Sequence, residues 1–280
     1  MASKSAVQPH EFERPVLDLS GELLRGALQT MVSGSEEHGG IERYIDAVKL
    51  KSTMFRQALV ENEIRELDLE TFKGLCTFMA TVRRRISSWL NEDSFGDMRE
   101  LIVDLFDESE HIDNRIGRFC DAFPQDKKHR WVRDLAAELL HNADPERVPM
   151  MNRWIWDAKA NTGVIREIWH ADDIDRLTIR VADNYGTYIM LREELSQFLS
   201  DNGVFRDVLY YVDVLCAQVY AQYICEQGGS YLRADFSAPE DPMQHTRRLL
   251  GLDGVQPGNG RTRLKSIDGE AYLIDDQSLN

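Results

Sequence analysis

Three pairs of side chains in this sequence have a spacing that could bind metal. A glutamate precedes a histidine by three residues in ESEH, ELLHNAD and EIWHADD. The pairs are Glu108 with His111, Glu138 with His141, and Glu167 with His170. Helical bundles hold paired iron or manganese ions with Glu-x-x-His motifs. One hypothesis is therefore a di-iron or di-manganese carboxylate enzyme that uses some of these six residues.

The apolar faces of the same segments argue against a metal site. In each segment the leucines and isoleucines form one apolar arc, and helical spacing turns both the glutamate and the histidine away from it. Metal ligands in a bundle project inward. The spacing instead predicts surface pairs, each of which stabilises a helix by about 0.2–0.5 kcal/mol. We expect no cofactor, with Fe or Mn as the alternative.

Asp213 lies in the most apolar segment of the chain, VFRDVLYYVDVLCAQVYAQYIC, with apolar or tyrosine residues on both sides of it. A buried carboxylate must be paired, hydrogen-bonded or neutral, and its pKa can then suit general acid–base catalysis. Asp213 is therefore the one candidate for a catalytic group. The favoured alternative is a structural hydrogen bond to a tyrosine hydroxyl or to an arginine such as Arg180.

The segment MMNRWIWDAKANTG has the composition of a protein interface, because it concentrates methionine, tryptophan and arginine. At helical spacing Trp154 shares a face with Met150, whereas Trp156 points elsewhere. Arg153, Trp154 and Trp156 are therefore candidates for partner binding, with packing inside the chain as the alternative. Tyr272 is a fourth candidate, because it lies in a C-terminal hairpin that must dock on its own body or on a partner.

Two short basic runs could bind anions. They consist of Arg83, Arg84 and Arg85, and of Lys127, Lys128 and Arg130 within KKHR. The second run lies near a predicted helix N-terminus, where cations oppose the helix dipole and a bound anion is favoured. The alternative is ordinary solvated charge, because neither run has interleaved aromatic residues or belongs to a recognisable nucleic-acid module.

The composition of the whole chain restricts the classes of function. The net charge of −15 arises from 33 basic and 48 acidic residues, so the surface repels nucleic acid and anionic membranes except at a local basic patch. Four cysteines without a C-x-x-C pair predict buried reduced thiols. Neither a secretory signal nor an uninterrupted apolar run of about 20 residues is found. These features predict a soluble cytoplasmic protein without a membrane partner.

The candidate residues described above lie mostly on helices that the periodicity of the apolar residues predicts. This periodicity dominates residues 18–227 and predicts an all-α, multi-helix globular bundle. Residues 204–227 are apolar on almost every face, which predicts a buried central helix. Other expected helices are 68–89 with Asp68 as N-cap, 98–123 with a kink near Asp107, 126–141, 149–160 and 172–200.

Three regions follow from this periodicity. They are a flexible N-terminus (1–17), an α-helical domain (18–228) and a C-terminal extension (229–280). In the extension, RTRLKSIDGEAYLID predicts a β-hairpin that turns at Asp268-Gly269.

No phosphate-binding loop, nucleophile elbow or thiol–base pattern occurs in the sequence. The sequence therefore favours a non-catalytic accessory, adaptor or assembly protein that acts in the cytoplasm by binding another protein, and a homo-oligomer is compatible with this role. A metal-dependent helical enzyme is the alternative. A nucleic-acid-associated protein that uses the two basic runs is the third hypothesis.

Overall fold

Ten α-helices form within the part of the chain that the structure, a computed structural model, describes: residues 15–36, 39–231, 243–252, 261–265 and 271–275. The fold is mostly helical, at 62% helix, which confirms the expected all-α globular class. The helices are α1 (Gly21–Ser35), α2 (Glu42–Arg56), α3 (Leu69–Thr77), α4 (Glu92–Leu105), α5 (Ile112–Asp121), α6 (Trp131–Ala143), α7 (Val164–Glu167), α8 (Tyr185–Asp201), α9 (Val208–Tyr231) and α10 (Gln244–Leu249). Side chains are described for the same residues except 175, 227–231 and two short strands.

Short polar side chains determine where several helices begin. The side chains of Ser20, Asp68, Asn91 and Asn184 accept hydrogen bonds from backbone N–H groups and thereby cap α1, α3, α4 and α8. A cap of this kind stabilises a helix by about 0.5–2 kcal/mol relative to alanine. The cap expected at Asp68 is confirmed, because the backbone nitrogen of Thr71 lies 2.7 Å from Asp68 Oδ1.

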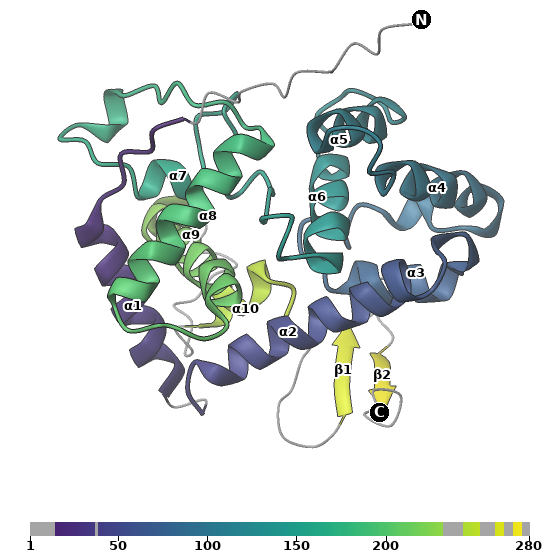
Figure 1. Cartoon of the computed structure of the whole chain (residues 1–280), viewed down its shortest axis with the longest axis horizontal. Coiled ribbons are helices and arrows are strands. Elements are labelled where there is room, and N and C mark those ends of the chain that lie inside the picture. The colour runs from purple at the N-terminus through teal and green to yellow at the C-terminus, as the bar shows by residue number, and fades with distance from the viewer. Residues whose placement is uncertain (1–14, 37–38, 232–242, 253–260, 266–270, 276–280) are drawn as a thin grey trace, which may run out of the picture.

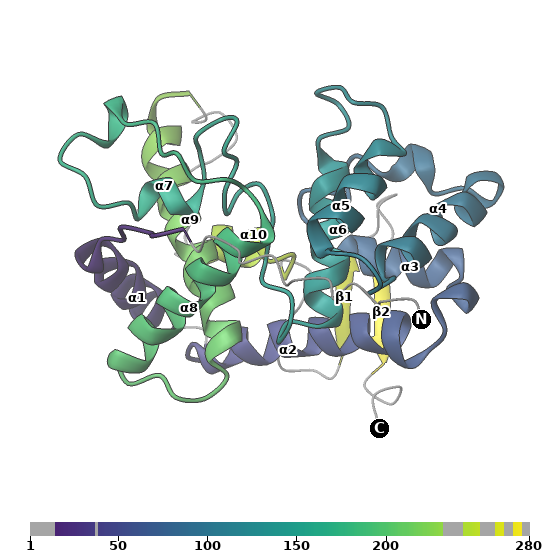
Figure 2. The ribbon, with the colours of Figure 1, turned by 45° about the horizontal axis from the view of Figure 1, so that its top comes forward.

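The helices form two lobes that α2 joins (Figures 1 and 2). The α6 lobe contains α3, α4, α5 and α6, and the α9 lobe contains α1, α7, α8, α9 and α10. Helix α2 runs along the base of both lobes, contacts α6 and α9, and continues into a π-helical turn at Gln57–Glu61. Side chains of α2 can therefore bridge the two lobes.

The central helix of the α9 lobe is the one that the sequence predicted over 204–227. Helix α9 is contacted by α1, α2, α7, α8 and α10. By length and composition its stretch Val208–Glu226 could cross a membrane, and half of that stretch is buried. Five surrounding helices are the environment of a core helix in a globular protein.

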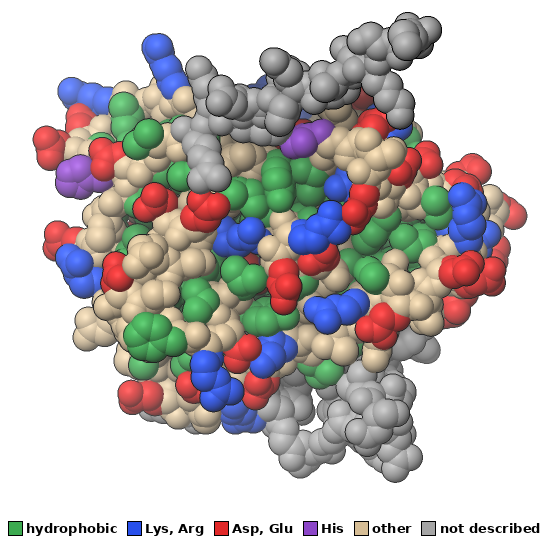
Figure 3. All heavy atoms as spheres, viewed as in Figure 1, with side chains coloured by type: hydrophobic (Ala, Val, Ile, Leu, Met, Phe, Trp, Pro, Cys, Tyr) green, Lys and Arg blue, Asp and Glu red, His purple; other side chains and the backbone are tan. Residues whose placement is uncertain are grey.

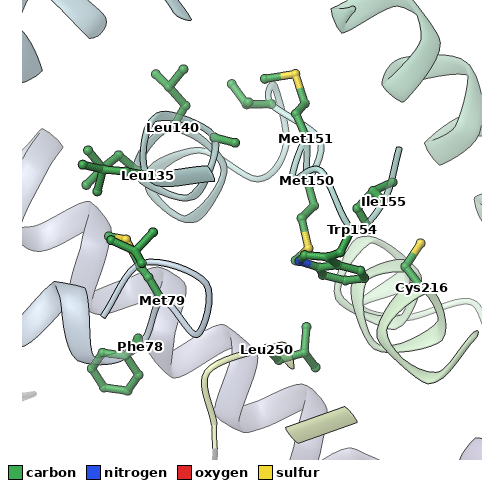
Figure 4. Packing of buried hydrophobic residues seen from close by; sticks show 14 of the residues in the cluster. Phe78, Met79, Leu135, Leu140, Met150, Met151, Trp154, Ile155, Cys216 and Leu250 are labelled. Carbon is green, nitrogen blue, oxygen red and sulfur yellow. The ribbon is translucent and has the colours of Figure 1, made fainter. Parts of the chain in front are cut away.

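The hydrophobic core is continuous between the lobes. Figure 4 shows Leu135 and Leu140 on α6, Trp154 beside Met150, and Cys216 on α9. All five side chains are at most 8% exposed. The segment between α6 and α7 therefore fills the space between the two principal helices with apolar side chains.

Several helices are shorter than the periodicity predicted, because local polar groups end them. The expected helix over 98–123 is two helices, α4 and α5. Between them Asp107 accepts a hydrogen bond from the backbone nitrogen of Ser109 at 3.0 Å, and His111 then caps α5. The helix expected over 68–89 ends at Thr77, and the one expected over 172–200 begins only at Tyr185.

Residues 149–160 form turns and extended segments, and not the helix that their spacing predicted. The carboxylate of Asp157 accepts a hydrogen bond from the backbone nitrogen of Ala160 at 2.9 Å, which closes a tight turn. Asn161 and Gly163 have φ values of 53° and 122°, which an α-helix excludes. A Cβ atom at Gly163 would lie 2.7 Å from the carbonyl oxygen of Ile155, so this turn needs glycine.

Part of the expected C-terminal extension belongs to the core. Met243, Leu250 and Leu252 are at most 2% exposed, and α10 packs against α9. The hydroxyl of Thr246 donates a hydrogen bond of 2.7 Å to Gln218 Oε1 on α9. The boundary expected at residue 228 therefore does not separate the helical body from a removable appendage.

Two strands, β1 (Arg261–Lys265) and β2 (Ala271–Asp275), pair antiparallel, with Arg261 opposite Asp275 and Lys265 opposite Ala271. This pairing is the predicted hairpin. The predicted turn at Asp268-Gly269 lies outside the described residues, and so does the expected flexible N-terminus up to residue 14.

Candidate functional site

The three Glu-x-x-His pairs have different surroundings. Glu108 is exposed and accepts two hydrogen bonds from Arg147, at 2.6 and 2.9 Å, while His111 caps α5. Glu167 is the last residue of α7, and His170 is exposed. In the described part of the chain, no three His, Cys, Asp or Glu side chains are grouped so that they could hold a metal ion.

Glu138 and His141 face inward, so the expectation that they project away from the core is wrong. Their exposed fractions are only 2% and 3%. Nearly every residue of α6 is buried, because α2 and α5 both pack against this helix. Helical spacing predicts one buried and one solvated face for this segment, but α6 has no fully solvated face.

Glu138 belongs to a buried group of polar side chains, which we call the polar junction: Lys51, Glu138, Asn142 and Asn152. Lys51 Nζ lies 2.8 Å from Glu138 Oε2 and donates a second hydrogen bond of 3.0 Å to the carbonyl oxygen of Leu250. Asn142 and Asn152 donate to the two carboxylate oxygens of Glu138, at 2.9 and 3.1 Å. The junction thus ties α2, α6, α10 and the turns after α6 together through one matched pair of charges.

The position of Lys51 in the sequence indicates this junction, although the periodicity of the acidic and basic residues alone did not predict it. Lys51 lies in helical register with Tyr44, Val48 and Phe55, which form the apolar stripe of α2 and are at most 5% exposed. A lysine within an apolar stripe needs a buried acidic partner. The identity of that partner, 87 residues away, is visible only in the fold.

His141 pairs with Asp213 and thereby joins α6 to α9. The His141 Nε2 and Asp213 Oδ2 atoms are 3.0 Å apart, and His141 Nδ1 lies 2.8 Å from the carbonyl oxygen of Val148. Asp213 is 4% exposed. Asp213 thus makes a structural hydrogen bond, as the favoured alternative predicted, but its partner is a histidine. The predicted partners were a tyrosine or Arg180, and Arg180 is exposed.

Both nitrogens of His141 face oxygen acceptors, an arrangement that suits the protonated ring. Burial by itself lowers the pKa of His141, but the Asp213 carboxylate and the Val148 carbonyl outweigh burial and raise the pKa above its usual value. The adjoining cavity, of about 20 Å³, is lined by both side chains and holds about one water molecule. Burial also raises the pKa of the Cys216 thiol on the same cavity, so that thiol is a poor nucleophile.

The junction and the His141–Asp213 pair can hold charge and a proton, but the cavity of about 20 Å³ beside His141 and Asp213 is too small for a substrate. No family model, curated protein or solved structure matches the chain. The function must therefore be argued from the chemistry of its own surfaces and cavities.

The tryptophans proposed for partner binding are core residues. Trp154 and Trp156 are 5% and 0% exposed, and Trp156 Nε1 donates a hydrogen bond of 3.0 Å to the carbonyl oxygen of Val181. The Trp154 ring packs on Tyr220, with centroids 5.8 Å apart. Packing inside the chain is therefore the right interpretation for both rings. The side chain of Tyr272 lies outside the described part of the chain.

Lys127 and Arg130 of the second basic run line a surface hollow of about 510 Å³, which we call the basic hollow. Its cationic side chains are Lys127, Arg130, Arg133, Arg153 and Lys159, and its carboxylates are Asp126, Asp157 and Asp183. These residues come from the α5–α6 connection, the first turn of α6, the 153–160 turns and the residues before α8. The fold thus gathers five cations against three carboxylates in a chain of net charge −15.

Aspartates hold the arginines of the basic hollow in place. Arg130 pairs with Asp157, and Arg133 pairs with Asp183, whose carbonyl oxygen it also binds at 2.7 Å. Arg153 Nη2 lies 2.7 Å from Asp134 Oδ2, just behind the hollow. These pairs fix the guanidinium groups but neutralise much of their charge.

The other predicted anion-binding residues do not line this hollow. Lys128 is exposed beside it, and Arg83, Arg84 and Arg85 lie in the turns after α3. Across the face shown in Figure 3, basic and acidic side chains are interspersed around exposed hydrophobic ones. On this face neither sign of charge predominates, in contrast to the local excess of cations in the hollow.

Proposed function

We propose that this protein is a non-catalytic accessory or assembly protein that binds an acidic segment of another protein in the basic hollow. The observation that carries the proposal is the excess of five cationic side chains over three carboxylates around one concave site of a strongly acidic chain. Complementary charge of this kind steers a partner and fixes its orientation. The proposed partner surface is therefore the basic hollow, and not Trp154 and Trp156, which the composition of their segment had suggested.

Two lysines of the hollow could form ion pairs with a partner. Neither Lys127 nor Lys159 has an acidic partner among the described residues, and both are exposed. The apolar floor, which includes Phe123 and Val132, suits a peptide better than a free inorganic anion. A segment that alternates acidic and apolar side chains matches both features.

The start of α6 adds to the attraction for carboxylates. Helix α6 begins after Arg130, which makes no side-chain cap, at the edge of the hollow. Uncapped backbone N–H groups at a helix N-terminus favour negative charge. The dipole and the lysines therefore act in the same direction.

The test is the binding of a fluorescent peptide rich in aspartate, glutamate and leucine, followed by anisotropy at low salt. Lys127→Glu and Lys159→Glu should each weaken binding by roughly 3- to 10-fold, because an attractive charge becomes repulsive. Lys128→Glu is the matched control, since it changes the net charge equally beside the hollow but outside it. Its affinity should stay close to that of the parent protein.

Equal losses for Lys127→Glu and Lys128→Glu would show that only overall charge matters, and would overturn the proposal. A single-stranded oligonucleotide should bind more weakly than the peptide. Tighter binding of the oligonucleotide, with a steep loss on adding salt, would favour the nucleic-acid-associated function instead.

A cytoplasmic location remains part of this proposal. All four cysteines are free in the structure, and Cys76 and Cys216 are buried, which supports a reducing compartment. Size-exclusion chromatography of the full chain would establish whether it forms a homo-oligomer.

A further inference from the structure

The cavity that has the most unusual chemistry lies at the far end of α6 from the basic hollow. Its volume is about 730 Å³, within the range of small-molecule sites, and it shares no lining residue with the hollow. The end of α2, the π-helical turn, the α4–α5 connection, the end of α6 and Tyr185 surround it. Arg115 of α5 lies in its wall, and we call it the Arg115 cavity.

Arg115 is a buried cation without an acidic partner. It is only 9% exposed, and no carboxylate among the described residues lies within ion-pair distance of it. Its Nη1 donates a hydrogen bond of 3.2 Å to the carbonyl oxygen of Leu105, while its Nε is buried without any acceptor. A buried guanidinium that lacks a counter-charge is expensive unless another group completes its shell.

The nearest acids do not complete that shell. Glu108 also lines the cavity, but both of its oxygens are held by Arg147, at 2.6 and 2.9 Å. Burial lowers the pKa of Arg115, and the Glu108 charge offsets this only in part. Arg56, which also lines the cavity, is exposed and has no acidic partner in the described part of the chain. Two guanidinium groups thus face one cavity without a protein carboxylate of their own.

The rest of the lining specifies what kind of anion fits. Nearly half of the lining residues are apolar: Leu59, Val60, Ile64, Phe106, Ile112, Leu140, Ala143 and Val148. The acidic residues Glu110, Asp144 and Glu146 also line it, so a dianion would be repelled more than a monoanion. The structure assigns to the Arg115 cavity a small organic monoanion, a carboxylate on an apolar body, whose head group binds Arg115. This ligand is independent of the acidic partner proposed for the basic hollow.

The test is calorimetric titration of the full chain with octanoate, with its uncharged counterpart octanamide, and with inorganic phosphate. Octanoate should bind roughly 10- to 100-fold more tightly than octanamide, the ratio expected for a hydrogen bond to a charged group. Phosphate should bind more weakly than octanoate, since it lacks an apolar body. Octanamide binding as tightly as octanoate, phosphate binding more tightly than octanoate, or no octanoate binding at all would each overturn the assignment.

Substitution of Arg115 then locates the site. Arg115→Met should reduce the affinity for octanoate by roughly 10-fold or more while leaving octanamide unchanged. Arg84→Met is the matched control, because Arg84 is exposed and outside the cavity. Unchanged octanoate binding by Arg115→Met would overturn the proposal. The comparison of octanoate with octanamide uses the unaltered protein, so it remains decisive even if Arg115→Met fails to fold.

Discussion

Among the described residues one lysine and one arginine are buried, and their surroundings differ. Lys51, in the polar junction, is 2% exposed and has a carboxylate and a carbonyl oxygen as partners. Arg115, in its cavity, is 9% exposed and has one carbonyl oxygen. Lys51 lies where helices from both lobes meet, whereas Arg115 faces a space of about 730 Å³. A paired buried charge indicates a structural role, and an unpaired one beside a cavity indicates a ligand.

The largest effect is expected when the paired cation loses its partner. Glu138→Gln leaves the Lys51 ammonium buried without a counter-charge, so the free energy of unfolding should fall by about 3–5 kcal/mol. Urea denaturation at neutral pH measures this change. The double variant Lys51→Met/Glu138→Leu should recover most of the loss, because both charges are then gone. A loss smaller than 1 kcal/mol, roughly the value of an exposed pair, would show that the junction is hydrated.

A smaller effect, dependent on pH, is expected at the His141–Asp213 pair. The folded pKa of His141 lies above its unfolded value. The stability that the pair contributes is therefore fully present below about pH 6.5, the unfolded pKa, and is lost as pH rises through the folded pKa. Asp213→Asn should lower the free energy of unfolding by about 1–3 kcal/mol at low pH and should flatten this decline.

Urea denaturation at a series of pH values, from below about 6.5 upward, measures the free energy of unfolding of the wild type and of Asp213→Asn. The difference between the two proteins should shrink as the pH rises. A difference that stays constant with pH would mean that His141 is not protonated in the folded protein.

The smallest effect is expected at the unpaired cation. Arg115→Met, in the absence of ligand, should change the free energy of unfolding by no more than about 1 kcal/mol, because the lost hydrogen bond to Leu105 is offset by relief of the buried charge. Lys51→Met is the matched substitution and should destabilise by about 3–5 kcal/mol, since it leaves Glu138 unpaired. Equal losses for the two variants would remove the distinction between structural and ligand-binding cations.

The fold class and the central helix could be predicted from the sequence, because helical spacing dominates the chain and α9 is apolar on almost every face, as a buried helix is. The chemistry of α6 could not. Glu138 and His141 lie outside its apolar arc, as surface residues do, and their charged partners Lys51 and Asp213 are 87 and 72 residues away in the sequence. Residues 149–160 were misassigned because the turn that the Asp157 side chain closes prevailed over helical spacing.

The contact between Lys51 and Leu250 has a consequence for how the protein is made. The two residues are 199 positions apart, so the second acceptor of Lys51 is synthesised long after the lysine itself. Gly251, with φ 73°, then brings the backbone against Phe78, where a Cβ atom would lie 1.7 Å from the Phe78 carbonyl oxygen. A nascent chain that ends at α9 still lacks these contacts, and loops of this length close slowly. The two lobes can therefore complete their common core only after residue 252 has been synthesised, and a nascent chain that ends earlier leaves apolar surface of that core exposed.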